Sequence, residues 1–283
     1  MSTVTTVTAA DINKLRQTTG AGMMDCRKAL VESDGDFEKA IDYLRKKGQK
    51  VAALRSDREA KEGVIIAKTT ADNKSGFIIT LACETDFVAK NADFVAFAQS
   101  FMDVAMGNNV KSLDELQSAQ LDGVTITDKI NDQVAKIGEK IQLARFERVD
   151  AEAVVAYIHG AYRMGVLVGL TRNSAAVLEA GRNIAMQIAA MNPVAIDPDS
   201  VPAEVVTRER AIVTEQIKND PKMAGKPDDM IDKIAGGKLN AFFKENTLTA
   251  QAFVKDAGKT VGDYLKSVDA DVKVIQFKRV QLG

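Results

Sequence analysis

The sequence predicts an α+β protein: a bundle of three short helices, then a duplicated β-β-α core with antiparallel sheets and an inserted helical hairpin. Three observations predict this fold. The first segment carries helix caps and stops at short intervals. Residues 63–106 and 153–191 then repeat one order of strand, turn, strand, loop and helix. Finally, residues 203–245 carry apolar stripes at helical spacing on both sides of a polar tip.

Residues 1–50 are predicted to form three helices with a small core of their own. Capping residues and glycines mark their starts and stops: Thr8 with Asp11, Gly20 with Gly22, and Asp36. Apolar residues at helical spacing follow each cap, and Gly48 is expected to end the third helix. A core of this size is marginal and is typical of small peptide-binding bundles.

The chain then turns basic, and residues 51–62 are expected to form a linker. Between Arg45 and Lys61, Lys and Arg side chains outnumber the carboxylates, which are only Asp57 and Glu59. Two interpretations stay open: a solvated helix end with its linker, or an electrostatic patch that faces a partner.

The two β-β-α units are expected to form the basis of two core subdomains, residues 63–148 and 149–283. In the second unit, the covering helix carries an apolar stripe of Ile184, Ile188 and Met191. Between the units, residues 111–120 and 128–144 are helix-like. Antiparallel sheets covered by helices are the arrangement that this order of elements favours.

Within the second subdomain, residues 203–219 and 228–245 are predicted to form the hairpin, with "NDPKMAGKP" as its tip. One helix has two candidate rows, Val205 with Ile212 and Val206 with Val213, and Ile217 continues the second row. The returning helix carries a stripe of Met230, Ile231, Ile234, Ala235, Leu239, Phe242 and Phe243. After the hairpin, Thr260 is expected to cap a short helix, and "VKVIQFKRVQ" is expected to be a closing strand.

Composition excludes several functional classes. Lys and Arg total 38 against 39 Asp and Glu, so no net charge draws the chain to nucleic acid or anionic lipid. With two cysteines, Cys26 and Cys83, and one histidine, we expect no metal site and no cofactor. We expect both thiols to be reduced and buried. The sequence shows neither a secretory signal nor an apolar run near the ~18 residues of a membrane span, which predicts a cytoplasmic protein.

Enzyme motifs are missing from the sequence. There is no phosphate-binding glycine loop, no nucleophile elbow and no zinc-protease helix. His159 is the only histidine available as a base, and a hydrogen-bonded turn or core residue is its simpler interpretation. We therefore expect a binding protein rather than an enzyme.

Two apolar positions allow alternative interpretations. Met23 and Met24 are adjacent at a helix start, so at most one lies centrally on the buried face; the other is half covered, or both are adaptable contact groups. In "CETDFVAKNADFVAF", a strand gives way to a helix at Asp86 and Phe87. Either Thr85 or Asp86 caps that helix with Phe87 in the core, or Asp86 and Phe87 both face outward as a wedge.

Three long segments, in order, resemble the elongation factor Ts family: "LRQTTGAGMMDCRKALVESDGDFEKAIDYLRKKG", "TDFVAKNADFVAF" and "YIHGAYRMGVLVGL". The resemblance runs over essentially the whole chain. It implies a guanine-nucleotide exchange factor that binds elongation factor Tu in its GDP-bound and nucleotide-free states. It also implies that the first helices form a ubiquitin-associated-like docking domain and that the hairpin is an antiparallel coiled coil.

The resemblance also implies which residues touch the partner. Arg16, Met23 and Met24 match contact positions of the docking domain, and Arg27 stands where many relatives have lysine, which keeps the charge. Thr85 to Val88 match the central motif, whose intruding pair, Asp86 and Phe87, enters near the magnesium and phosphate site of elongation factor Tu. His159 matches a contact of the second subdomain.

Two other interpretations remain at this stage. The chain is a non-catalytic adaptor whose helical bundle binds peptides, or residues 9–33 bind DNA as a helix-turn-helix. The near-neutral charge disfavours the second, so we expect no direct contact with nucleic acid and none with membranes. The sequence leaves the oligomeric state open, a homo-oligomer included.

Overall fold

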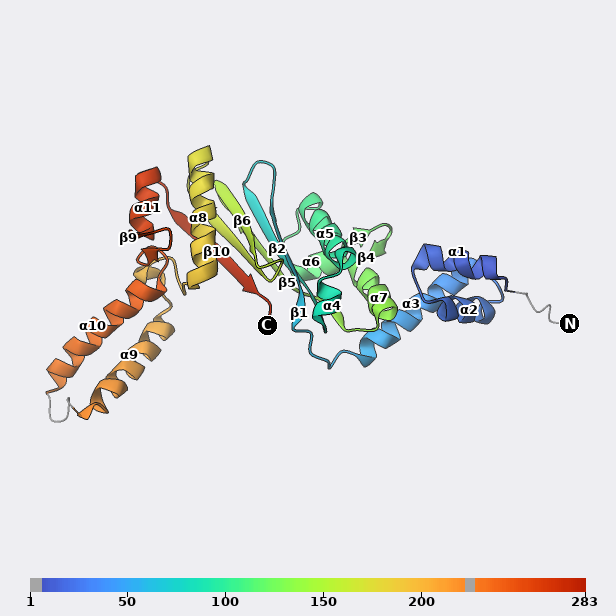
Figure 1. The fold of residues 1–283 in the computed structure, drawn as a ribbon, viewed down its shortest axis with the longest axis horizontal. Coiled ribbons are helices and arrows are strands. Elements are labelled where there is room, and N and C mark those ends of the chain that lie inside the picture. Colours follow the sequence, from blue (N-terminus) through green and yellow to red (C-terminus); the bar gives the residue numbers. More distant parts are fainter. Residues whose placement is uncertain (1–6, 222–226) are drawn as a thin grey trace.

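The computed structural model describes residues 7–221 and 227–283, and it has the predicted α+β fold (Figure 1). The molecule is elongated, with the N-terminal helices at one end, the sheets in the middle and the helical hairpin at the other end. The start of the N-terminal segment, residues 1–6, and residues 222–226 of the expected hairpin tip lie outside the described residues.

Helices α1 (Ala9–Thr19), α2 (Met23–Glu32) and α3 (Phe37–Leu54) confirm the three expected N-terminal helices. The predicted capping box is present, because the Thr8 hydroxyl accepts from the Asp11 N–H at 3.2 Å while the Asp11 carboxylate accepts from the Thr8 N–H at 3.1 Å. The Asp36 side chain caps α3 as expected. These helices bury a separate apolar cluster of Leu15, Cys26, Ala29, Leu30, Ala40 and Leu44.

The expectation that Gly48 ends the third helix is wrong. Helix α3 continues to Leu54, because Gly48 serves helix packing rather than helix termination. A Cβ at Gly48 would lie 3.0 Å from the backbone oxygen of Asn131 in α7 (Ile126–Ile137), so the missing side chain lets the two helices approach closely. The helix therefore runs through the predicted start of the linker, and the division at residues 50 and 62 stays a prediction.

The two expected β-β-α units are present, and each is completed by a third antiparallel strand. In the first sheet, with order β1-β2-β5, the strands are β1 (Glu62–Thr69), β2 (Ser75–Cys83) and β5 (Ile141–Asp150). In the second, with order β10-β7-β6, they are β6 (Ala153–His159), β7 (Met164–Leu170) and the expected closing strand β10 (Val274–Gln281).

The core is layered, with the two sheets packed face to face between helices (Figure 1). Helices α5 (Ala92–Gly107), α6 (Leu113–Ser118) and α7 cover the outer face of the first sheet. Helix α8 (Ala175–Met191) covers that of the second, and α11 (Val261–Val268) packs against α8. The inner faces share a buried apolar cluster that includes Ile65, Ile78, Val149, Val154, Leu167 and Val280. The central strands, β2 and β7, are buried on both faces, so their sequences are nearly continuous apolar runs.

The helix-like reading of residues 128–144 is wrong in its second part. Helix α7 ends at Ile137, where Gly138 takes the left-handed conformation with φ 81°, and strand β5 begins at Ile141. Ile141 and Leu143 are buried while Gln142 is less so, which is the period of a strand. Met191 of the predicted α8 stripe is also exposed, since it is the last helical residue, whereas Ile184 and Ile188 are buried.

Smaller elements connect these layers. A short hairpin of β3 (Gln120–Leu121) and β4 (Val124–Thr125) joins α6 to α7. A second, β8 (Ala252–Phe253) with β9 (Asp256–Thr260), precedes α11, which Thr260 caps as predicted. A turn of 3₁₀ helix, Pro198–Ser200, leads into the helical hairpin.

The helical hairpin consists of α9 (Ala203–Lys218) and α10 (Asp228–Asn246), as predicted. Its helices bury an apolar cluster of their own with Ile217, Ile231 and Ala235 at its centre. Of the two candidate rows on α9, the one through Val213 packs against α10, whereas Ile212 is exposed. The hairpin projects away from the sheets in Figure 1.

Candidate functional site

The junction between β2 and α4 (Asp86–Ala89) presents Phe87 to solvent. The Phe87 side chain is 84% exposed, so the interpretation that places it in the core is wrong. Its neighbours hold the helical turn in place, because Ala89 is buried and the half-buried Val88 packs against the first apolar core. The local fold therefore directs the aromatic ring outward from a fixed base.

Asp86 lies beside Phe87 and is ionised at neutral pH. Its carboxylate forms an ion pair with Lys90, with 2.6 Å between Oδ2 and Nζ. The hydrogen bond from Lys90 lowers the pKa of Asp86 below its ordinary value. An exposed aromatic ring and a negative charge thus share one turn of helix.

Thr85 does not cap this helix with its side chain, contrary to one of the two interpretations. Its hydroxyl instead donates to Oε1 of Glu139 at 2.6 Å, and its backbone N–H donates to Oε2 of the same carboxylate at 3.0 Å. The Cys83 thiol donates to the Thr85 carbonyl at 3.2 Å. We call the two bonds from Thr85 to Glu139 the Thr85 clamp.

Glu84 holds the same junction to the basic segment. Its carboxylate accepts the Lys140 N–H at 2.5 Å and pairs with Arg55 at 3.3 Å and Arg58 at 3.1 Å. The hydrogen bond from Lys140 is the largest cause that lowers the pKa of Glu84. Lys47 pairs with Asp25, and Lys61 pairs with Glu59. Internal pairing of these cations favours the interpretation of a helix end and linker over a patch that faces a partner.

Both cysteines are free and buried, as expected. Burial, assisted by the nearby carboxylates of Glu139 and Glu62, raises the pKa of Cys83 to about 12. The thiol therefore stays protonated near neutral pH and remains a hydrogen-bond donor to Thr85. Neither cysteine has the environment of a reactive thiolate.

The predicted N-terminal contact residues lie on the surface of α1 and α2. Met23 is 53% exposed and Met24 is 71% exposed, so the interpretation with one of them in the core is wrong. Helix α2 instead directs its later apolar residues inward, and they form the bundle core. Arg16 and Arg27 are also exposed.

The predicted contact residues occupy separate surfaces. Figure 1 shows α2 at one end of the molecule and α4 beside the first sheet. His159 ends β6 in the second sheet, where it is exposed and its Nδ1 lies 2.9 Å from the Tyr157 hydroxyl. The structure therefore brings Thr85 to Val88 together, whereas the predicted N-terminal contact residues and His159 lie on other surfaces.

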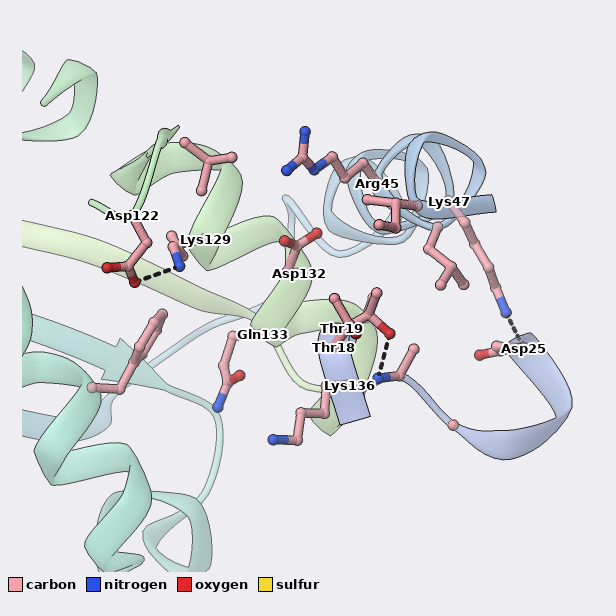
Figure 2. Close-up of a pocket in the computed structure, with 17 residues that line it drawn as sticks. Thr18, Thr19, Asp25, Arg45, Lys47, Asp122, Lys129, Asp132, Gln133 and Lys136 are labelled. Carbon is pink, nitrogen blue, oxygen red and sulfur yellow. Dashed lines mark hydrogen bonds and ion pairs between the residues drawn. The ribbon is translucent and has the colours of Figure 1, made fainter. Parts of the chain in front are cut away.

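A cavity of about 340 Å³ lies between the N-terminal helices and α7 (Figure 2). Its lining mixes apolar side chains such as Ile41, Leu44 and Phe97 with charged ones. Among the charged ones, Lys129 pairs with Asp122 and Lys47 pairs with Asp25. Burial raises the pKa of Asp132 in its wall. Because none of the predicted contact residues lines it, we regard this cavity as a seam between packed segments.

Neither a metal site nor a membrane span emerges from residues 7–221 and 227–283. No group of at least three His, Cys, Asp or Glu side chains there is arranged to hold a metal ion. No helix in the same part of the chain is long and apolar enough to cross a membrane.

Sequence comparisons cover nearly the whole chain. Residues 84–283, which include the Thr85–Val88 turn and His159, match the family "Elongation factor TS". The chain is 48% identical to the elongation factor Ts of Christiangramia forsetii and 48% identical to that of Flavobacterium psychrophilum, covering 98% of this chain and 99% of each relative. It is 46% identical to the elongation factor Ts of Cytophaga hutchinsonii, over 99% of this chain and 100% of that relative. The chain therefore belongs to the elongation factor Ts family.

Proposed function

We propose that the chain accelerates GDP release by inserting the Asp86–Phe87 turn, which we call the wedge, into elongation factor Tu near its magnesium and phosphate site. As a member of the elongation factor Ts family, the protein is a guanine-nucleotide exchange factor for elongation factor Tu in translation elongation, and it is not an enzyme. This membership decides against the adaptor and DNA-binding interpretations. It also agrees with the expected cytoplasmic location.

The observation that carries the proposal is the exposure of Phe87 on a firmly held base. Burial of a phenylalanine side chain stabilises a fold or a complex by ~1.5–3 kcal/mol. Phe87 contributes almost none of this to its own fold, because 84% of the side chain is exposed. The free energy is therefore available when the ring is buried against a partner.

The wedge acts on the groups that hold the nucleotide. A GTPase binds its phosphates through backbone N–H groups and a Mg²⁺ ion, so small displacements of those elements weaken binding. Phe87 pushes apart partner side chains that support this site. The charged Asp86 carboxylate disturbs the polar network around the magnesium without becoming a lasting ligand.

Linkage limits how much the wedge alone achieves. If the chain weakens GDP binding tenfold, it must bind nucleotide-free elongation factor Tu ten times more tightly than it binds the GDP-bound form. Each tenfold corresponds to ~1.4 kcal/mol, so complete burial of Phe87 accounts for at most about a hundredfold. The N-terminal residues and His159 supply further binding energy from their separate surfaces. Exchange becomes faster, and the relative affinity of elongation factor Tu for GTP and GDP stays the same.

The direct test of function is stopped-flow release of fluorescent GDP from elongation factor Tu with and without the full chain. We expect release to become faster and to saturate as the concentration of the chain rises. Tight binding to elongation factor Tu without faster release would support an adaptor and would contradict the proposal.

A further inference from the structure

We propose that Glu139 is a positioning residue for nucleotide exchange, because the Thr85 clamp fixes the orientation of the wedge. This inference rests on the proposed function of Asp86 and Phe87. Glu139 belongs to the loop between α7 and β5 and lies 54 residues from Thr85 in the sequence, yet one carboxylate accepts both polar hydrogens of that threonine. The wedge begins at the next residue.

Thr85 is held on more than one side. Its N–H and hydroxyl donate to Glu139, while its carbonyl accepts from the Cys83 thiol. With these groups engaged, the backbone that leads into Asp86 has little freedom to rotate. Bonds to a charged acceptor are about twice as strong as neutral ones, so the carboxylate dominates this arrangement.

The Thr85 clamp takes the place of an ordinary helix cap. Thr8, Thr125 and Thr260 precede helices, and each hydroxyl accepts from a backbone N–H of its own helix. Thr85 occupies the same position before α4 but makes no such bond. Helix α4 has only four residues, too few to hold its own shape. Its orientation therefore depends on contacts from outside, and the Thr85 clamp is a polar contact at the residue just before the helix.

Glu139 itself is fixed by the core. Gly138 ends α7 with a left-handed turn, and β5 begins two residues after Glu139, paired with β2 through Ile141 and Cys83. The next residue, Lys140, donates its N–H to Glu84. The segments 84–85 and 139–140 are thus joined by adjacent bonds, and the wedge is positioned from a sheet. Loss of such positioning is costly, since a misplacement of about 1 Å can reduce a rate by about a hundredfold.

Two substitutions of Glu139 distinguish the hydrogen-bonding geometry of the Thr85 clamp from the charge of the carboxylate. Glu139→Gln keeps the length, so its amide oxygen can accept the Thr85 N–H while its NH₂ donates to the Thr85 hydroxyl oxygen. Glu139→Ala removes both partners. A positioning role therefore predicts that glutamine retains most of the exchange activity and alanine does not.

The experiment measures the maximal rate of stimulated GDP release from elongation factor Tu, at saturating chain, for Glu139→Ala, Glu139→Gln, Phe87→Ala and the double variant Glu139→Ala with Phe87→Ala. We expect Glu139→Ala to lower the maximal rate about tenfold, as for a lost hydrogen-bonded charged group. The half-saturating concentration should change much less. In the Phe87→Ala background the same substitution should have little further effect, since it acts through the wedge.

The matched control is Asp263→Ala. Asp263 accepts the N–H and the hydroxyl of Thr260 at 3.3 Å and 2.8 Å, the same chemistry at the start of α11. Its loss should affect folding comparably and leave exchange unchanged. If Glu139→Ala does not fold, Thr85→Val, which removes the hydroxyl bond alone, is measured in the same way and is expected to slow exchange.

The outcomes separate this inference from the proposed function. If the single variant Phe87→Ala slows GDP release but the single variant Glu139→Ala releases GDP at the wild-type rate, the role of Glu139 is overturned and the proposed wedge stands. Effects that simply multiply in the double variant would also overturn it, because Glu139 would then act independently of Phe87. A Phe87→Ala variant with normal exchange would overturn both.

Discussion

Gly48 of α3 faces Asn131 of α7 so closely that a Cβ at Gly48 would lie 3.0 Å from the Asn131 backbone oxygen. This contact joins α3 of the N-terminal helices to α7, which covers the first sheet. The N-terminal helices are therefore connected to the core by packed helices rather than by the linker alone. The contact can be tested by adding a single methyl group.

Gly48→Ala should lower stability relative to the same substitution at an open helical position. At Gly107 in α5 a Cβ would meet no atom within 4 Å, so Gly107→Ala should stabilise the protein by ~0.5–1 kcal/mol. Gly48→Ala adds a methyl group to a close contact, so its free energy of unfolding should be at least ~1 kcal/mol lower than that of Gly107→Ala. The free energy of unfolding in urea measures both. Equal stabilisation by the two substitutions would show that α3 and α7 are not in close contact.

Met24→Ala should weaken binding to elongation factor Tu without changing the maximal exchange rate. Loss of an exposed apolar contact of this size costs ~1 kcal/mol, or about a fivefold rise in the half-saturating concentration. Val31→Ala is the matched control, because Val31 is an exposed apolar residue of the same helix and was not predicted to touch the partner. Equal effects of the two substitutions would contradict a specific contact at Met24.

Replacement of residues 203–245 by a short linker should leave the core folded. The hairpin helices bury their own apolar cluster, and the chain on either side of them is joined by backbone bonds from Val194 to Asn246 at 2.8 Å and from Leu248 to Ala195 at 2.9 Å. Thermal unfolding followed by circular dichroism should remain cooperative. A loss of cooperativity would mean that the hairpin belongs to the main core.

Cys83 should resist thiol reagents and make stability depend on pH in the alkaline range. Its pKa is raised from 9.0 to about 12 in the folded protein, so the folded state holds the proton more tightly than the unfolded state. The contribution is complete below pH 9 and is lost as the pH rises from 9 towards 12. Denaturant unfolding at several pH values should show this loss, and Cys83→Ala should reduce it. Rapid labelling of native Cys83 at pH 8 would contradict the assignment.

The sequence predicted the elements whose signals are local. Capping residues such as Thr8, Asp36 and Thr260 act on the next turn of chain, and they marked helix starts correctly. The prediction that Gly48 ends α3 was wrong because a glycine that ends a helix and a glycine in a helix contact have similar neighbours in the sequence. Only the position of Asn131 decides between them. Strand β5 was missed because its third-strand role depends on pairing with β2, far away in the sequence.

The candidate site divides in the same way. Asp86 and Phe87 were found because they lie within one recognisable motif. Periodicity left the exposure of Phe87 open between two interpretations, since a helix of four residues has too few positions to reveal its buried face, and only the family resemblance favoured the exposed one. Glu139 was missed for a different reason. Its role depends on a bond to Thr85 across 54 residues, and a glutamate after a helix-ending glycine has no distinctive sequence signal.

The central claim, that Phe87 is an exposed wedge, is tested most directly by measuring unfolding and stimulated GDP release together for Phe87→Ala. Truncation of a buried phenylalanine costs ~3–5 kcal/mol, and the fully buried Phe94 of α5 provides the comparison through Phe94→Ala. We predict near-normal unfolding and strongly slowed GDP release for Phe87→Ala, with a smaller loss of exchange for Asp86→Ala. Large destabilisation of Phe87→Ala with unchanged exchange per folded molecule would contradict the account.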